Sequence, residues 1–73
     1  MRENGFIKAW RPDKGYGFIS REGCPDLFCH VSEVEAGDAE LIQPGTRAEF
    51  VVGTDSRGRL QALDVVLQGE RQN

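Results

Sequence analysis

Apolar and polar residues alternate in five short runs along the chain. The runs cover residues 6–10, 16–20, 27–30, 47–52 and 60–67. A period of two is typical of half-buried β-strands, and no window shows the three-and-four spacing of an amphipathic helix. The pattern therefore predicts an all-β chain with five strands.

Turn-forming residues separate these runs. Residues 11–15 and 53–59 are rich in glycine, proline and small polar residues, which predicts turns or flexible loops. Residues 31–46 form a longer connection, in which residues 32–34 are able to make one helical turn. Closing five strands into a barrel removes the unpaired edges of an open sheet. We therefore expect a five-stranded antiparallel OB-type β-barrel over residues 1–67, followed by a polar tail or the start of a linker at 68–73.

The inward positions of the alternating runs predict one hydrophobic core. Its expected members are Ile7, Ile19, Leu27, Cys29, Val34, Ile42, Ala48, Phe50, Val52, Leu63 and Val65, with Ala9 as a further candidate. A chain of 73 residues has room for one such core and one domain. No apolar stretch reaches the roughly 18 residues that a membrane-spanning helix needs, and we expect a cytoplasmic protein.

The chain contains two cysteines, Cys24 and Cys29. They are too few for the disulfide framework of a small secreted domain, so we expect two reduced thiols. A metal site would need a further ligand besides these two and His30. Cys29 and His30 are adjacent, so on a strand they point to opposite faces. We therefore expect neither a metal ion nor another cofactor.

Charge is distributed unevenly, although the net charge is only −3. Residues 1–21 carry five cationic and two acidic side chains, whereas residues 22–56 carry one arginine and eight acidic side chains. The distribution predicts one basic side on an acidic domain. The alternative is that these charges only solvate a small domain.

Aromatic side chains remain on the outside once the core is assigned. Tyr16 and Phe18 are two residues apart, as are Phe28 and His30, so each pair shares one face of its strand. Trp10 is expected on the same side as Lys8, and two further cations, Lys14 and Arg57, lie in adjoining loops. Exposed rings beside cations suit a single strand, because bases stack on rings while cations contact phosphates. The alternative is that the rings form a local cluster that supports the barrel.

Two motifs resemble those of the cold-shock domain family. Residues 14–19 (KGYGFI) are similar to its first ribonucleoprotein-type motif, and residues 26–32 (DLFCHVS) are similar to its second. Gly5, the pair at 44–45 and the pair at 61–62 extend the resemblance over residues 5–66. The resemblance implies binding of single-stranded nucleic acid through Lys8, Trp10, Lys14, Tyr16, Phe18, Phe28, His30 and Arg57.

The chain departs from the family pattern at several aromatic positions. The Trp-Phe pair that usually ends the first strand is replaced by Ala9 and Trp10. Val31 stands where an aromatic residue usually follows the histidine, and the acidic loop at 35–40 lacks a ring. Phe6 occupies a position that is often polar in the family. The departures predict a reduced stacking surface and weak binding.

These observations favour a binding protein over an enzyme. His30 and Ser32 superficially resemble a base and a nucleophile, but an outward histidine among rings suits stacking, and so short a chain lacks a cleft-forming segment. We expect a monomer that binds single-stranded RNA or DNA as an RNA chaperone or regulator, with no role for a membrane. The alternative is a protein-interaction OB module with reduced nucleic-acid binding, including one at the N-terminus of a longer protein.

Overall fold

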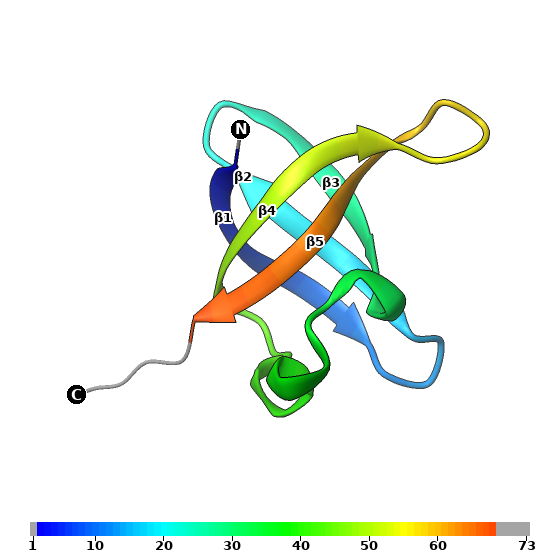
Figure 1. The fold of residues 1–73 in the computed structure, drawn as a ribbon. Helices are drawn as coiled ribbons and strands as arrows, with labels where there is room; N and C mark the ends of the chain where they lie inside the picture. Colours follow the sequence, from blue (N-terminus) through cyan, green and yellow to red (C-terminus); the bar gives the residue numbers. More distant parts are fainter. Residues whose placement is uncertain (1, 69–73) are drawn as a thin grey trace.

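The computed structural model describes residues 2–68, and they form an all-β domain (Figure 1). The strands are β1 (Glu3–Arg11), β2 (Tyr16–Arg21), β3 (Cys24–His30), β4 (Arg47–Thr54) and β5 (Leu60–Gln68). Two 3₁₀ helices, η1 (Val31–Glu33) and η2 (Ala36–Leu41), lie in the connection between β3 and β4. All five predicted strands are confirmed. Gln68 ends β5 rather than starting a tail, and the remainder of the predicted tail lies outside the described residues.

The five strands close into one barrel in the order β1-β2-β3-β5-β4. Neighbouring strands are antiparallel except for β3 and β5, which meet in a short parallel pairing between Phe28 and Gln61. β1 closes the barrel, because its first residues pair with β4 and its later residues pair with β2. The crossover with η1 and η2 lies at one end of the barrel, below the strands in Figure 1. The expectation of an OB-type barrel is confirmed.

Among the side chains that the structure describes, nine are buried in the barrel and form its core. They are Ile7, Ile19, Leu27, Cys29, Ala48, Phe50, Ala62, Val65 and Leu67. Val34, Ile42 and Val52 are partly buried and pack against this cluster, as do Trp10 and Leu41. The predicted core is therefore confirmed at seven positions and is wrong at Ala9, which is exposed, and at Leu63, which is half-buried. The seven are Ile7, Ile19, Leu27, Cys29, Ala48, Phe50 and Val65.

A β-bulge explains the error on β5. Between Glu49 and Val51 of β4 the register with β5 shifts, so that β5 contains one residue more than its partner. Asp64 lies within this shift and has φ 52°, a left-handed conformation that is uncommon for a residue other than glycine. The extra residue puts Ala62 and Val65 inside and leaves Leu63 half-buried beside Gly53.

Carboxylates of the crossover attach it to β5. Glu33 Oε1 accepts a hydrogen bond from the backbone N–H of Asp64 at 3.0 Å, and Asp38 Oδ2 accepts one from the backbone N–H of Leu67 at 2.7 Å. Each bond satisfies a backbone donor of β5. Two of the acidic side chains in this segment therefore have a structural use.

Candidate nucleic-acid interface

The predicted aromatic side chains gather on the outer face of β2 and β3. Phe18 lies directly opposite Phe28, and Tyr16 lies directly opposite His30. The ring centroids of Tyr16 and Phe28 are 5.2 Å apart, and those of Phe18 and Phe28 are 6.1 Å apart. We refer to Tyr16, Phe18, Phe28 and His30 as the aromatic patch.

The aromatic patch is open to solvent. Phe18 is 39% exposed and His30 is exposed, while Tyr16 and Phe28 are half-buried. Phe18 meets the rings of Tyr16 and Phe28 edge-on, at interplanar angles of 90° and 78°. In such a contact the edge of one ring meets the face of the other, so the rings support one another. Exposed apolar rings of this kind are typical of an interaction surface.

His30 has a fixed orientation. It caps the N-terminus of η1, where its Nδ1 accepts a hydrogen bond from the backbone N–H of Ser32 at 3.1 Å. The Ser32 Oγ lies 2.9 Å from the same nitrogen. An accepting Nδ1 leaves the ring proton of a neutral imidazole on Nε2. The imidazole is therefore held by local contacts beside Tyr16.

A β-bulge in β1 decides which residues of that strand face outward. Ile7 pairs with Ile19 and Ala9 pairs with Phe18, so Lys8 is the extra residue. Because of this insertion, Ala9 joins the outward row of Phe18, whereas Trp10 lies opposite the buried Gly17. The expectation that Trp10 points outward on the same side as Lys8 is therefore wrong. Binding through Trp10 stays a prediction, and its orientation predicts only a small contribution.

Trp10 packs toward the interior of the barrel. Its side chain is partly buried and contacts the core cluster. A Cβ atom at Gly17 would collide with the Trp10 ring and with the carbonyl oxygen of Ala9, so only glycine leaves room for this packing. Gly17 therefore serves the packing of Trp10.

Residues outside the predicted set enlarge the site. A hollow of about 360 Å³ is lined by Tyr16, Phe18, Asp26, Phe28, Asp55, Arg59 and Leu60. Leu60 is 47% exposed and brings an apolar side chain to the aromatic patch. The β3–β5 pairing brings Leu60 here, and sequence alternation within β5 gave no sign of it.

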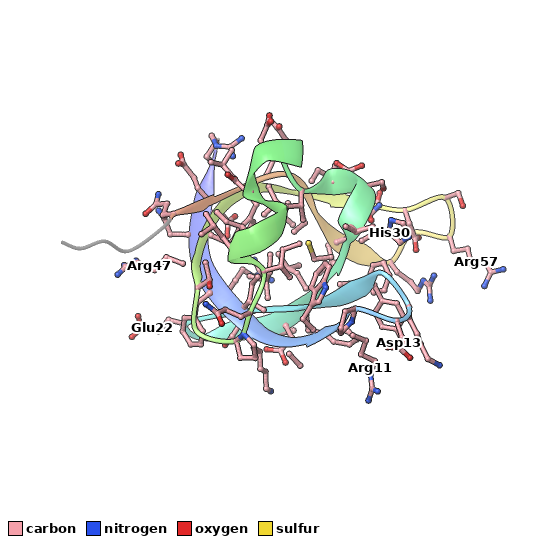
Figure 2. The ribbon with its side chains drawn as sticks, turned by 90° about the horizontal axis from the view of Figure 1, so that it is seen from below. Arg11, Asp13, Glu22, His30, Arg47 and Arg57 are labelled. Carbon is pink, nitrogen blue, oxygen red and sulfur yellow. The ribbon has the colours of Figure 1, made fainter. Side chains whose placement is uncertain are left out.

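Arg11 is a second addition. It is exposed and lies directly opposite Tyr16, on the same face as the ring. Since β1 contains a bulge, its position relative to Tyr16 does not follow from counting residues. The structure thus adds a cation beside Tyr16, and Figure 2 shows Arg11 projecting into solvent.

Two cations near the aromatic patch are already paired with carboxylates. Lys8 Nζ lies 2.9 Å from Asp26 Oδ2, and Arg59 Nε lies 2.9 Å from Asp55 Oδ2. Asp55 also accepts backbone hydrogen bonds from Arg57 and Arg59, at 2.8 and 2.9 Å. The backbone hydrogen bond from Arg59, with that from Arg57 and the Arg59 guanidinium, lowers the pKa of the Asp55 carboxyl. Asp55 thus organises the β4–β5 loop as an anion.

Lys14 and Arg57 lie in exposed turns at this side of the barrel. Lys14 belongs to the β1–β2 turn and Arg57 to the β4–β5 loop. Neither forms an ion pair with a side chain that the structure describes. Figure 2 shows Arg57 projecting into solvent at the edge of the molecule that also carries His30. Contact of these two side chains with phosphates stays a prediction. Their exposed positions in the two turns are compatible with it.

Cys29 and His30 lie on opposite faces of β3, as expected from their adjacency. Cys29 is 1% exposed, while His30 is exposed. Burial, and to a lesser extent the charge of Glu33, raises the pKa of the Cys29 thiol to about 12. Among residues 2–68 no three His, Cys, Asp or Glu side chains are grouped as metal ligands would be. Within the same range no helix has the length and apolar character needed to cross a bilayer.

Known proteins similar to this chain share one domain type. The family model of the "cold-shock" DNA-binding domain matches residues 3–68. A cold shock-like protein of Aquifex aeolicus is 37% identical over 71 residues, which cover 96% of this chain and 100% of that protein. The major cold shock protein CspA of Pseudomonas aeruginosa is 38% identical over 64 residues, covering 88% of this chain and 91% of that protein.

A solved structure gives the same result for the fold. The structure of "drosophila Unr CSD456" matches this chain with a TM-score of 0.77 and 33% sequence identity. The match covers 94% of this chain and 27% of that longer chain. The barrel as a whole therefore corresponds to one part of the longer protein.

Proposed function

The chain belongs to the cold-shock DNA-binding domain family, whose members bind single-stranded nucleic acids, and from this premise we propose that it binds an unpaired RNA or DNA strand along the aromatic patch. Bases stack on Tyr16, Phe18 and Phe28. Phosphates contact the cations in the adjoining turns, Lys14 and Arg57. The mechanism tolerates many sequences, because every base has a π-face and stacking does not depend on a hydrogen-bond pattern.

One observation carries this proposal: three rings from two paired strands lie close together on the outside of the barrel. All three centroid separations are 6.2 Å or less, and Phe18 is 39% exposed. The barrel core is complete without them, because the buried cluster consists of other residues. A base stacked on such a ring contributes about 1–3 kcal/mol.

The acidic composition is compatible with this function. Glu33 and Asp38 accept hydrogen bonds from the backbone of β5. An acidic crossover also suits a protein-interaction module, but these two carboxylates have an internal explanation. No observation on residues 2–68 favours that alternative.

The biological role that follows is RNA chaperoning or regulation by a monomeric cytoplasmic domain. Weak stacking on several rings holds a strand unpaired without selecting a sequence. We assign no catalytic role to His30 and Ser32. The His30 Nδ1 accepts from the Ser32 backbone N–H, a contact that caps η1. Binding, with no covalent step, accounts for the geometry.

A titration of single-stranded against duplex oligonucleotides tests the proposal. Fluorescently labelled strands of mixed sequence, as RNA and as DNA, are titrated with the protein and followed by anisotropy. We expect both unpaired strands to bind and the matched duplex to bind much more weakly, because stacking requires exposed base faces. Equal affinity for the duplex would point to phosphate contacts alone and would contradict the proposal.

Two variants connect this binding to the aromatic patch. Phe18→Ala and Phe28→Ala are each expected to lose about 1–3 kcal/mol of binding to the unpaired strand while remaining folded. Leu63→Ala is a matched apolar truncation on the β4–β5 surface and is expected to bind normally. If the ring variants unfold, or if binding per folded molecule is unchanged, the rings support the barrel instead.

A further inference from the structure

Phe6 is an exposed ring that neither the core nor the aromatic patch uses. Its side chain is 48% exposed, more than that of Phe18. In the barrel it lies between two strands, directly opposite Ser20 of β2 and directly opposite Arg47 of β4. An aromatic ring with this much exposed surface is a candidate for a contact with a ligand.

The outer face of β2 connects Phe6 to the aromatic patch. Phe18 and Ser20 are two residues apart on β2, and the extra residue of the β1–β2 pairing lies on β1, so both side chains point outward. The β1 bulge follows Ile7 and does not affect the pairing of Phe6. Phe6 is therefore the diagonal neighbour of Phe18, a relation in which Cα atoms are about 7–8 Å apart. Phe6 extends the same face by one ring.

A hollow adjoins Phe6 and contains polar groups. It has a volume of about 450 Å³, and its walls include Asn4, Phe6, Ser20, Glu22 and Arg47. Arg47 forms no ion pair with any side chain that the structure describes. Figure 2 shows Arg47 and Glu22 at the edge of the barrel opposite to His30 and Arg57. The hollow thus lies beyond the far end of the aromatic patch.

Resting on the proposed function, we propose that Phe6 and Arg47 form a further nucleotide subsite for the same strand. The next base beyond the aromatic patch stacks on Phe6, and its phosphate contacts the Arg47 guanidinium. Glu22 also lines this hollow, and its carboxylate repels phosphate, which favours a backbone position at Arg47. A ring paired with a cation is the combination that single-strand binding requires at each step. The subsite compensates for the ring that Ala9 does not supply.

Affinity as a function of strand length tests this subsite. Strands of one base type and of mixed sequence, from about four to about ten nucleotides, lie within the range of OB-fold site sizes. The difference in affinity between the wild-type protein and Phe6→Ala is expected to grow with length and to reach about tenfold, the effect of one stacked base. Phe18→Ala is expected to weaken binding at every length.

Substitutions separate stacking from simple apolar contact. Phe6→Trp is expected to retain or increase affinity for the long strands, whereas Phe6→Leu is expected to lose it because leucine has no planar face. Arg47→Gln is expected to reduce the salt dependence of long-strand binding by about 0.7 in the slope of log affinity against log salt concentration. Thermal unfolding of each variant is measured as a control, and a Tm close to that of the wild type shows that the fold is retained.

The outcomes distinguish this inference from the proposed function. If Phe18→Ala weakens binding and Phe6→Ala has no effect at any length, the subsite is wrong and the proposed function stands. If Phe6→Leu binds long strands as tightly as the wild type, stacking on Phe6 is excluded. If no unpaired strand binds the wild type, the proposed function itself fails.

Discussion

Ala9 lies directly opposite Phe18 in the pairing of β1 with β2, on the face that carries the aromatic patch. The position is exposed and has only a methyl group. A tryptophan there would stand beside Phe18 and add a stacking surface. We expect Ala9→Trp to bind unpaired strands more tightly by about 1–3 kcal/mol, the value of one stacked base.

The control for this substitution is Ala9→Leu, which adds apolar surface without a planar face. It is expected to change affinity much less than Ala9→Trp. Equal affinity of Ala9→Trp and the wild-type protein, measured by anisotropy on the same strands, would contradict the assignment of the missing ring to Ala9.

Trp10 fluorescence is expected to report unfolding more strongly than binding. The Trp10 side chain lies on the inner face of β1, where it packs against the core. Trp10 pairs with Gly17 of β2. A bound strand on the outer face therefore contacts it little. In the double variant Ala9→Trp, Trp10→Phe, the sole tryptophan is on the outer face, and we expect strong quenching by an unpaired strand. Stronger quenching in the wild type than in the double variant would show that our orientation of β1 is wrong.

Gly17→Ala is expected to destabilise the barrel. The new Cβ would collide with the Trp10 ring and the Ala9 carbonyl oxygen. Overpacking of this kind costs about 1–3 kcal/mol, and each kcal/mol lowers the Tm of a small domain by about 4–8 °C. Gly37→Ala is the control, because a Cβ there meets nothing within 4 Å. Thermal unfolding of the two variants is compared, and equal Tm values would contradict the tight packing at Gly17.

The two cysteines are expected to react very differently with a thiol reagent. Cys24 is exposed and Cys29 is buried. Cys24 should be alkylated rapidly in the folded protein, while Cys29 should react only on unfolding. A Cys24→Ser variant isolates the second reaction, whose rate should rise with denaturant. Rapid alkylation of Cys29 under native conditions would contradict its burial in the barrel.

Cys29 also makes stability depend on pH in the alkaline range. Burial raises the pKa of its thiol from 9.0 to about 12 in the folded state. The neutral thiol is therefore favoured by folding, and this contribution is complete below pH 9.0 and is lost as the pH rises through about 12. Denaturant unfolding across this range should show a steeper loss of stability in the wild type than in Cys29→Ala, which has no thiol to ionise. Equal slopes would rule out this contribution.

Salt dependence is expected to separate the two lysines near the aromatic patch. Lys14 has no ion-pair partner among the described side chains, whereas Lys8 is paired with Asp26 at 2.9 Å. Lys14→Ala should reduce the slope of log affinity against log salt concentration by about 0.7, the value for one phosphate contact on a single strand. Lys8→Ala should reduce it less, because Asp26 already neutralises that ammonium. A larger change for Lys8 would mean that the ion pair opens on binding.

Alternation along single strands was sufficient to predict most of the core and the aromatic patch. Ile19 and Phe18 illustrate this, because β2 alternates regularly and their faces follow from position alone. Phe28 and Cys29 on β3 were assigned to the correct faces for the same reason. The period of two is a local property, so it survives wherever no residue is inserted.

Register and long-range pairing were not predictable in this way. The bulge at Lys8 exchanges the faces of Ala9 and Trp10, which follow it. The bulge near Asp64 breaks the alternation between Leu63 and Val65, so these two residues do not share a face as predicted. A bulge depends on the partner strand as well as on the strand that contains it. Asp64 adopts φ 52° without being glycine, so its sequence gave no sign of the irregularity.

The sequence by itself determined the all-β class, the five strands and the pair spacing of Tyr16 with Phe18 and of Phe28 with His30. These depend on local patterns of side chains, which act within a few residues. Only the tertiary structure decided that Ala9 faces outward, that Leu60 reaches the aromatic patch and that Phe6 lies diagonally from Phe18. Those relations join residues of different strands, and closure of the barrel sets their register, so no single stretch of sequence contains them.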